Sequence, residues 1–145
     1  MANITHQIGV TADHDKIFYA LTNIDGLSNW WTNETSGSAN KDGTIKFAFN
    51  GDGPEMKVTD VSKDSVKWEC LSGPDEWLGT NLLFKLEPCE NQTRIFFSHS
   101  GWKEETPFHY HCSMKWAVFM LSLKNYLNTG KGNPFPNDIP IEENC

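Results

Sequence analysis

The chain has 145 residues, 38% of them hydrophobic and 21% charged, a composition typical of a single globular domain. Acidic residues outnumber basic ones by 19 to 12, which gives a formal net charge of -7. Because no cluster of lysine and arginine offers a basic face, this charge pattern excludes nucleic acids and anionic membrane surfaces as expected partners.

The location of the protein is inferred from signals that the sequence lacks. Its longest apolar run, residues 117–121, is too short to span a bilayer. The first seven residues lack the basic and apolar segments of an export signal. Four cysteines, Cys70, Cys89, Cys112 and Cys145, occur without Cys-x-x-Cys spacing. We therefore expect a cytoplasmic protein whose cysteines are free thiols.

The first part of the chain predicts one strand followed by two short helices. Residues 3–10 alternate weakly between apolar and polar types, as a half-buried strand does. Residues 11–15 offer N-cap chemistry for an amphipathic helix that contains Ile17, Phe18 and Leu21. A second helical turn is expected over residues 24–31.

From Thr44 onward the apolar period changes to two, which predicts strands. Ile45, Phe47 and Phe49 form one face of the first of these strands, and the turn at residues 50–54 follows it. Further strands are expected at residues 56–61, 65–70, 77–87 and 93–100, joined by short loops. With the opening strand they predict a curved antiparallel sheet of about six strands.

The last predicted element is a long helix. Thr106 can cap it, Pro107 suits its first position, and Gly130 suits its C-terminal cap. Three- and four-residue spacing places one apolar stripe along it: Phe108, Cys112, Trp116, Phe119, Leu123 and Leu127. We expect this helix to lie in the concave face of the sheet, in an α+β architecture.

An ordered set of residues resembles one known family. It comprises the Trp30-Trp31 pair, Trp68, the Trp-Leu-Gly-Thr stretch at 77–80, the segment 93–102 and the helix end at 116–134. Over about residues 3–134 the chain resembles homologues of the C-terminal domain of the heat-shock-protein-90 ATPase activator, within the START-like (SRPBCC) superfamily. The resemblance implies a helix-grip fold with a cavity between sheet and helix. We expect a single domain over residues 1–132 and an irregular, proline-containing tail over residues 133–145.

The aromatic content predicts the lining of that cavity. The inward-facing positions are Trp30, Trp31, Phe47, Phe49, Met56, Trp68, Phe84, Phe97, His99, Trp116 and Phe119. One hypothesis is that they bind a small hydrophobic ligand; the alternative is that they fill the core. An empty cavity of ~300 Å³ would cost ~7 kcal/mol, so side chains, water or a ligand must occupy the space.

His99 is the polar residue of most interest, because strand alternation points it inward. A neutral buried imidazole could orient a ligand or exchange a proton near neutral pH. Alternatively, it is a core histidine with both nitrogens hydrogen-bonded. No nucleophile elbow or glycine-rich phosphate loop is present, so we assign no catalytic residue. A cyclase- or hydrolase-like enzyme that works by shaping its substrate stays an alternative to a non-catalytic protein.

We expect neither a metal nor a cofactor. His109, His111 and Cys112, with His99, are the residues that suggest a metal site. On a helix, however, His111 points about 160° away from His109 at 100° per residue, and the ligand spacing matches no known zinc motif.

A second stripe lies on the opposite face of the long helix. Met114, Val118 and Leu121 form this outer stripe. If exposed, it could bind a second copy of the chain or a chaperone, as a co-chaperone-type interaction module would. The alternative is that the proline-rich tail covers it.

Overall fold

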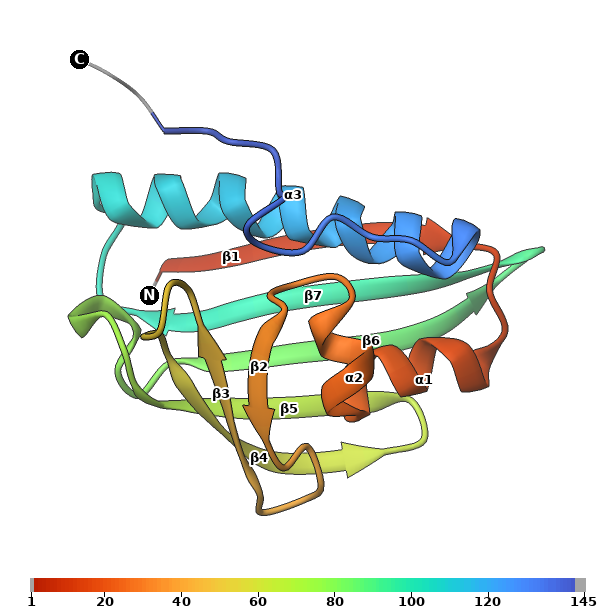
Figure 1. The fold of residues 1–145 in the computed structure, drawn as a ribbon, viewed down its shortest axis with the longest axis horizontal. Helices are drawn as coiled ribbons and strands as arrows, with labels where there is room; N and C mark the ends of the chain where they lie inside the picture. Colours follow the sequence, from red (N-terminus) through yellow and green to blue (C-terminus); the bar gives the residue numbers. More distant parts are fainter. Residues whose placement is uncertain (1, 143–145) are drawn as a thin grey trace.

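The computed structural model describes residues 2–142, in which seven strands form one curved antiparallel sheet (Figure 1). The strands are β1 (Ala2–Val10), β2 (Glu34–Gly37), β3 (Thr44–Ala48), β4 (Glu55–Ser62), β5 (Ser65–Ser72), β6 (Asn81–Cys89) and β7 (Gln92–Trp102). Their order across the sheet is β1-β7-β6-β5-β4-β3-β2, so the first strand pairs with the last. β2 is a seventh strand, which the sequence pattern did not predict.

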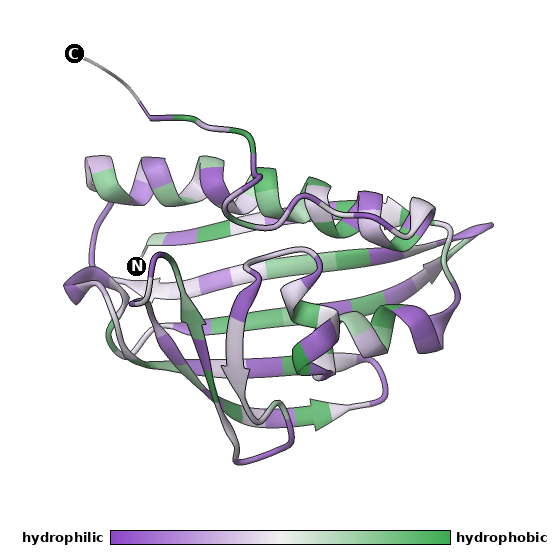
Figure 2. Ribbon diagram, viewed as in Figure 1, coloured by the Kyte–Doolittle hydropathy of each residue, from purple (hydrophilic) through white to green (hydrophobic). Residues whose placement is uncertain are grey.

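The predicted alternation of buried and exposed residues along the strands is confirmed. Phe84 on β6 lies opposite Phe97 on β7, and Leu82 lies between His99 on β7 and Trp68 on β5. All five side chains are fully buried. The alternation is visible as green and purple bands along the strands (Figure 2). Neighbouring rows of large side chains therefore give the sheet one continuous apolar face.

Two short helices connect β1 to β2. α1 (His14–Thr22) begins at Asp13, whose carboxylate accepts from the Lys16 backbone N–H at 3.1 Å. α2 (Ile24–Ser28) follows at once, capped by Asn23. The Trp30 indole N–H donates to the Ala20 carbonyl at 2.9 Å, which ties the residues after α2 back to α1.

The long helix α3 (Pro107–Thr129) begins and ends at the predicted caps. The Thr106 hydroxyl accepts from the His109 N–H at 3.3 Å, and Gly130 ends the helix in the left-handed conformation, with φ of 87°. Five of the six stripe residues are buried, and Phe108 is half-buried. The helix joins the same apolar cluster as the inner face of the sheet, which confirms the α+β helix-grip architecture.

The start of β6 differs from the sequence prediction. The strand expected from Trp77 begins at Asn81, because residues 75–77 form a 3₁₀ turn (η1, Asp75–Trp77) after Pro74. The chain then reverses at Gly79, whose φ of 77° favours glycine. Trp77 is therefore presented to the core from a loop.

The tail is anchored where it leaves α3 and runs back alongside that helix (Figure 1). The Asn133 N–H donates to the Ser122 hydroxyl at 2.7 Å. Phe135 forms a single bridge beside Thr32: its N–H donates to the Trp31 carbonyl at 2.7 Å, and its carbonyl accepts from the Asn33 N–H at 3.3 Å.

Three of the four cysteines lie in the part of the chain that the structure describes. Cys70, Cys89 and Cys112 are free thiols there, whereas Cys145 lies outside the described residues. No helix within residues 2–142 combines the length and the hydropathy needed to cross a bilayer.

Candidate functional site

A cavity of about 330 Å³ lies beside the N-terminal half of α3. Four other segments complete its wall: the end of the α2 turn at Trp31, the β3–β4 hairpin, the loop that carries Trp77, and the tail. The lining consists of Trp31, Phe49, Gly53, Pro54, Pro74, Trp77, Phe108, His111, Cys112, Lys115, Trp116, Phe119, Phe135, Asp138 and Glu142. We call this space the aromatic cavity.

The walls of the aromatic cavity are held by ring-to-ring contacts. Trp116 packs against Trp31 with 4.7 Å between ring centroids and stacks on Trp77 at 6.2 Å. On the other side, Phe49 contacts Phe135 of the tail at 5.1 Å, with the rings nearly perpendicular. Rings packed in this way have few accessible rotamers, so the aromatic part of the wall is rigid.

A glutamate at the sheet edge supports the hairpin side of the cavity. The Glu34 carboxylate accepts from the backbone N–H groups of Asn50 and Gly51 at 3.0 and 2.8 Å. This clamp fixes the turn between Phe49 and Pro54, both of which line the cavity. Glu34 thus positions the wall without lining it.

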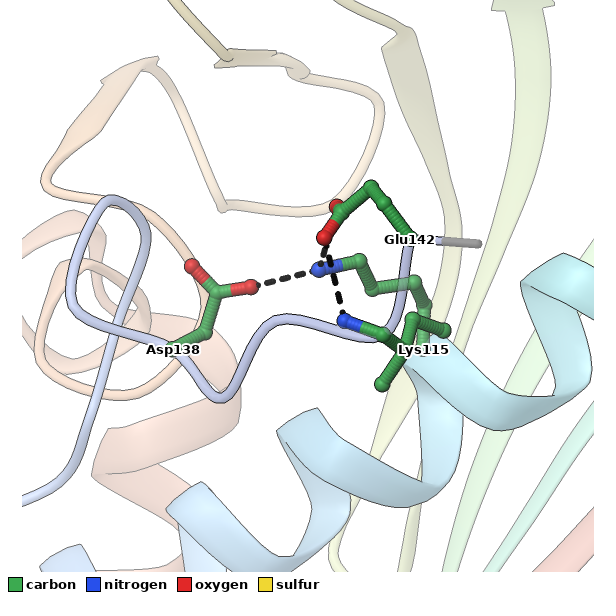
Figure 3. A network of polar contacts seen from close by, with 4 residues as sticks. Lys115, Asp138 and Glu142 are labelled. Atoms are coloured by element: carbon green, nitrogen blue, oxygen red, sulfur yellow. Dashed lines mark hydrogen bonds and ion pairs between the residues drawn. The ribbon is translucent and has the colours of Figure 1, made fainter. Parts of the chain in front are cut away.

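Three charged side chains, Lys115, Asp138 and Glu142, line the aromatic cavity, and they contact one another (Figure 3). The Lys115 ammonium, on α3, lies 2.7 Å from the Asp138 carboxylate and 3.5 Å from that of Glu142, both in the tail. Asp138 is 6% exposed and Glu142 is 62% exposed. The cavity is therefore amphipathic, with an apolar body and an ion-paired margin.

Four of the eleven predicted lining residues line this cavity: Trp31, Phe49, Trp116 and Phe119. The other seven are fully buried in the packed core outside it: Trp30, Phe47, Met56, Trp68, Phe84, Phe97 and His99. The two-residue alternation of apolar side chains identifies buried positions, but it does not distinguish residues packed in the core from residues that line a cavity.

Sequence reasoning also missed several lining residues. Phe108 belonged to the predicted apolar stripe, and that was a usable signal. Trp77 was placed in a strand, and Phe135 lies in a tail that carries no periodic pattern. Their places in the wall come from loop conformations that hydropathy does not encode.

His99 is a core histidine with both ring nitrogens bonded. The Trp116 indole N–H can only donate, so Nδ1 of His99 is the acceptor of that 3.1 Å bond. Nε2 therefore carries the proton and donates to the Thr80 hydroxyl at 2.8 Å. That hydroxyl in turn donates to the Trp77 carbonyl at 2.6 Å. Burial, with a smaller contribution from His109, lowers the pKa of His99 from 6.5 to about 3.

Within residues 2–142, no group of three or more His, Cys, Asp or Glu side chains is arranged to hold a metal. His109 is buried against the Trp102 ring, 4.8 Å between centroids, whereas His111 is exposed at the cavity margin. Burial raises the pKa of the Cys112 thiol to about 11, although the neighbouring Trp77 indole opposes the shift. A thiol held protonated in this way is a poor nucleophile at neutral pH.

A larger hollow, of about 580 Å³, lies between α1 and the end of α3. Its lining includes Asp13, Asp15 and Lys16, which are exposed and carry hydrated charges. Because a ligand there would compete with water for these groups, we place the candidate site in the smaller aromatic cavity.

The outer stripe of α3 is exposed, and residues 133–142 of the tail do not cover it. Met114 is 57% exposed and Leu121 is 54% exposed, whereas Val118 is half-buried. Tyr110, one turn before Met114 on the same face, is also exposed. The described tail instead lies along the side of α3 that carries Lys115 and Ser122.

The neutral state of His99 predicts a pH-dependent stability. Below about pH 6.5 the unfolded chain takes up a proton on His99, whereas the folded chain stays neutral until pH falls to about 3. Stability from this group is thus complete above pH 6.5 and declines as pH falls toward 3, by up to about 1.4 kcal/mol per pH unit. In urea denaturation, the stability advantage of wild type over His99→Gln should narrow by about 2 kcal/mol between pH 7 and pH 5. A constant difference across that range would contradict the neutral buried assignment.

Comparison with known proteins confirms the resemblance. The family model described as Activator of Hsp90 ATPase homolog 1-like protein matches residues 11–128. The Aha1 dimer from Colwellia psychrerythraea, solved in solution, is 51% identical, with a TM-score of 0.83 over 91% of this chain and 100% of that one.

Two more distant structures share the fold alone. CalU16 from Micromonospora echinospora is 15% identical with a TM-score of 0.78, covering 97% of this chain and 74% of that one. A conserved protein of unknown function from Enterococcus faecalis is 20% identical with a TM-score of 0.73, covering 95% and 77%. No protein with a curated description matches the chain significantly. On the family match and the 51% identity, the chain belongs to the family of Activator of Hsp90 ATPase homolog 1-like proteins.

Proposed function

We propose that this protein binds a small hydrophobic molecule in the aromatic cavity, without catalysing a reaction on it. The observation that carries the proposal is a rigid apolar hollow whose wall contains seven aromatic rings and polar groups along one margin. Such sites hold a ligand by excluding water from its apolar surface and orient it with a few polar contacts.

The cavity volume bounds the size of the ligand. Ligand pockets in proteins span about 300–1,000 Å³, and 330 Å³ lies at the small end of that range. A cavity of about 150 Å³ holds benzene, so this one has room for roughly two aromatic rings or an equivalent hydrocarbon. Water in so apolar a space finds few hydrogen-bond partners, and displacing it favours binding.

The location of His99 favours binding over catalysis. An enzyme of the cyclase or hydrolase type would need a proton-transfer group within reach of the substrate. His99 lies outside the aromatic cavity, with both nitrogens engaged and a pKa of about 3, and Cys112 is held as a thiol.

We place the protein in the cytosol, where its cysteines would stay reduced.

Partly filling the aromatic cavity should weaken binding without unfolding the protein. Trp116→Ala is a poor test, because it also breaks the bond to His99 and the packing on Trp31. Cys112→Leu instead adds volume to the wall. We expect Cys112→Leu to weaken binding of 2-naphthol, a neutral two-ring probe, about tenfold or more, because the larger side chain takes up space that the probe would occupy.

The matched control is Cys89→Leu, the same substitution at the end of β6 and outside the aromatic cavity. It should leave the affinity, measured by isothermal titration calorimetry, unchanged. The proposal fails if wild type shows no saturable binding of 2-naphthol or of a panel of neutral one- and two-ring compounds. It also fails if both leucine variants bind as tightly as wild type.

We also propose that the outer stripe of α3 is a homodimer interface. The most exposed apolar residues of α3, Tyr110, Met114 and Leu121, share this one face. The 51% identical protein from Colwellia psychrerythraea was solved as a dimer, which makes a second copy of this chain the preferred occupant.

Charged residues introduced into the outer stripe should dissociate the dimer into monomers. We expect wild type to sediment as a dimer and the double variant Met114→Glu/Leu121→Glu to sediment as a monomer, because two glutamates per copy would be buried against their own equivalents. Leu78→Glu, which alters a similarly exposed leucine in the loop before β6 rather than on α3, should stay dimeric. A monomeric wild type, or a double variant that stays dimeric, would contradict the assignment. If wild type is monomeric and the same double variant loses stimulation of an Hsp90 ATPase, the stripe serves a chaperone instead.

A further inference from the structure

The contacts that hold the tail differ before and after Asn137. Up to Phe135 it is fixed by backbone hydrogen bonds to Trp31, Asn33 and Ser122, and the Asn137 N–H closes a turn onto the Pro134 carbonyl at 2.8 Å. We call residues 138–142 the strap. Among the described residues, the polar contacts that join the strap to the rest of the fold are the two ion pairs of Lys115.

The Lys115–Asp138 pair is the stronger of the two. Its 2.7 Å distance is that of a charge-assisted hydrogen bond, and the Asp138 side chain is almost fully buried. The Lys115–Glu142 distance is longer, at 3.5 Å, and the Glu142 side chain is largely exposed, so water can replace Lys115 as its partner. Asp138 has no such freedom, because in the closed position it depends on Lys115 for its counter-charge.

The strap also forms part of the wall of the aromatic cavity, since Asp138 and Glu142 both line it. Figure 3 shows these two residues beside Lys115 of α3. A segment that closes a cavity, is held by one lysine and follows a fixed turn has the parts of a hinged gate. We propose that the strap gates the aromatic cavity: breaking the Lys115–Asp138 pair hydrates both charges and swings residues 138–142 away from α3. The role in ligand entry rests on the proposed function, but the opening itself can be tested without any ligand.

Two buried cysteines make that test possible. Cys112 lines the aromatic cavity, whereas Cys70 lies on β5 outside it. Both thiols are buried in the closed fold, and burial raises the pKa of each to about 11, so each should react slowly until an opening exposes it. In a Cys89→Ser/Cys145→Ser background, Cys112 reports opening of the cavity and Cys70 reports unfolding of the sheet.

Lys115→Met removes the ammonium but keeps a side chain of similar length. Asp138 would then be a buried carboxylate without a counter-charge, so the strap should open more often. We expect Cys112 to react with a thiol reagent roughly tenfold faster or more, with Cys70 unchanged. The acceleration cannot be a direct charge effect, because loss of a nearby cation disfavours the thiolate.

Two further variants sharpen the test. Lys124→Met makes the same substitution further along α3, outside the aromatic cavity, and should react as the background protein does. Lys115→Met/Asp138→Met replaces the ion pair with an apolar pair and should return the Cys112 rate to within about threefold of the background, since such replacements are well tolerated.

Three results would overturn the gate. Equal acceleration of Cys112 and Cys70 in Lys115→Met would mean global destabilisation, and an unchanged Cys112 rate would mean that the strap does not limit access. Failure of the double variant to slow the reaction relative to Lys115→Met would mean that the unpaired Asp138 charge does not drive the opening. None of these results depends on 2-naphthol binding, so the gate and the binding function succeed or fail separately.

Discussion

The structure depends on how Trp116 joins the long helix to the sheet. Its ring packs on Phe97 of β7 at 4.4 Å and on Trp31 at 4.7 Å, and its indole N–H donates to the buried His99. A helix lying in a curved sheet leaves a space that is too deep for aliphatic side chains alone, and indole rings fill it while still satisfying a polar partner. This one side chain therefore sets both the depth of the helix and the tautomer of His99.

The same packing explains why the cavity forms on one side of Trp116. Toward His99 the core contains a continuous chain of hydrogen bonds that ends at the Trp77 carbonyl, so both ring nitrogens of His99 are already engaged. On its other side the wall consists of loops and tail, and the rings of Phe49 and Phe135 meet without filling the interior. The charges of Lys115 and its partners lie where the tail crosses α3, which gives the cavity a polar margin and a segment able to move.

Much of the fold could be predicted because its main elements have strong local signals. The caps at Thr106 and Gly130 and the apolar stripe between them gave α3, and two-residue alternation gave six strands. β2 was missed because Glu34–Gly37 is short, polar and mostly exposed, so it carries no hydropathy pattern typical of a strand. It becomes a strand because its backbone pairs with β3. The cavity was only partly predictable for a related reason: burial of Trp68 or Phe84 can be inferred from alternation, but an unfilled volume depends on how separate loops meet.

The most direct test of the account uses the indole N–H signals of the six tryptophans in a ¹H–¹⁵N NMR titration with 2-naphthol. Trp31, Trp77 and Trp116 line the aromatic cavity, whereas Trp30, Trp68 and Trp102 are buried outside it. Binding in the cavity predicts saturable shifts that are largest for the first three. Saturable shifts that are instead largest for Trp30, Trp68 or Trp102, or no shifts at all, would contradict the central claim that the aromatic cavity is a binding site.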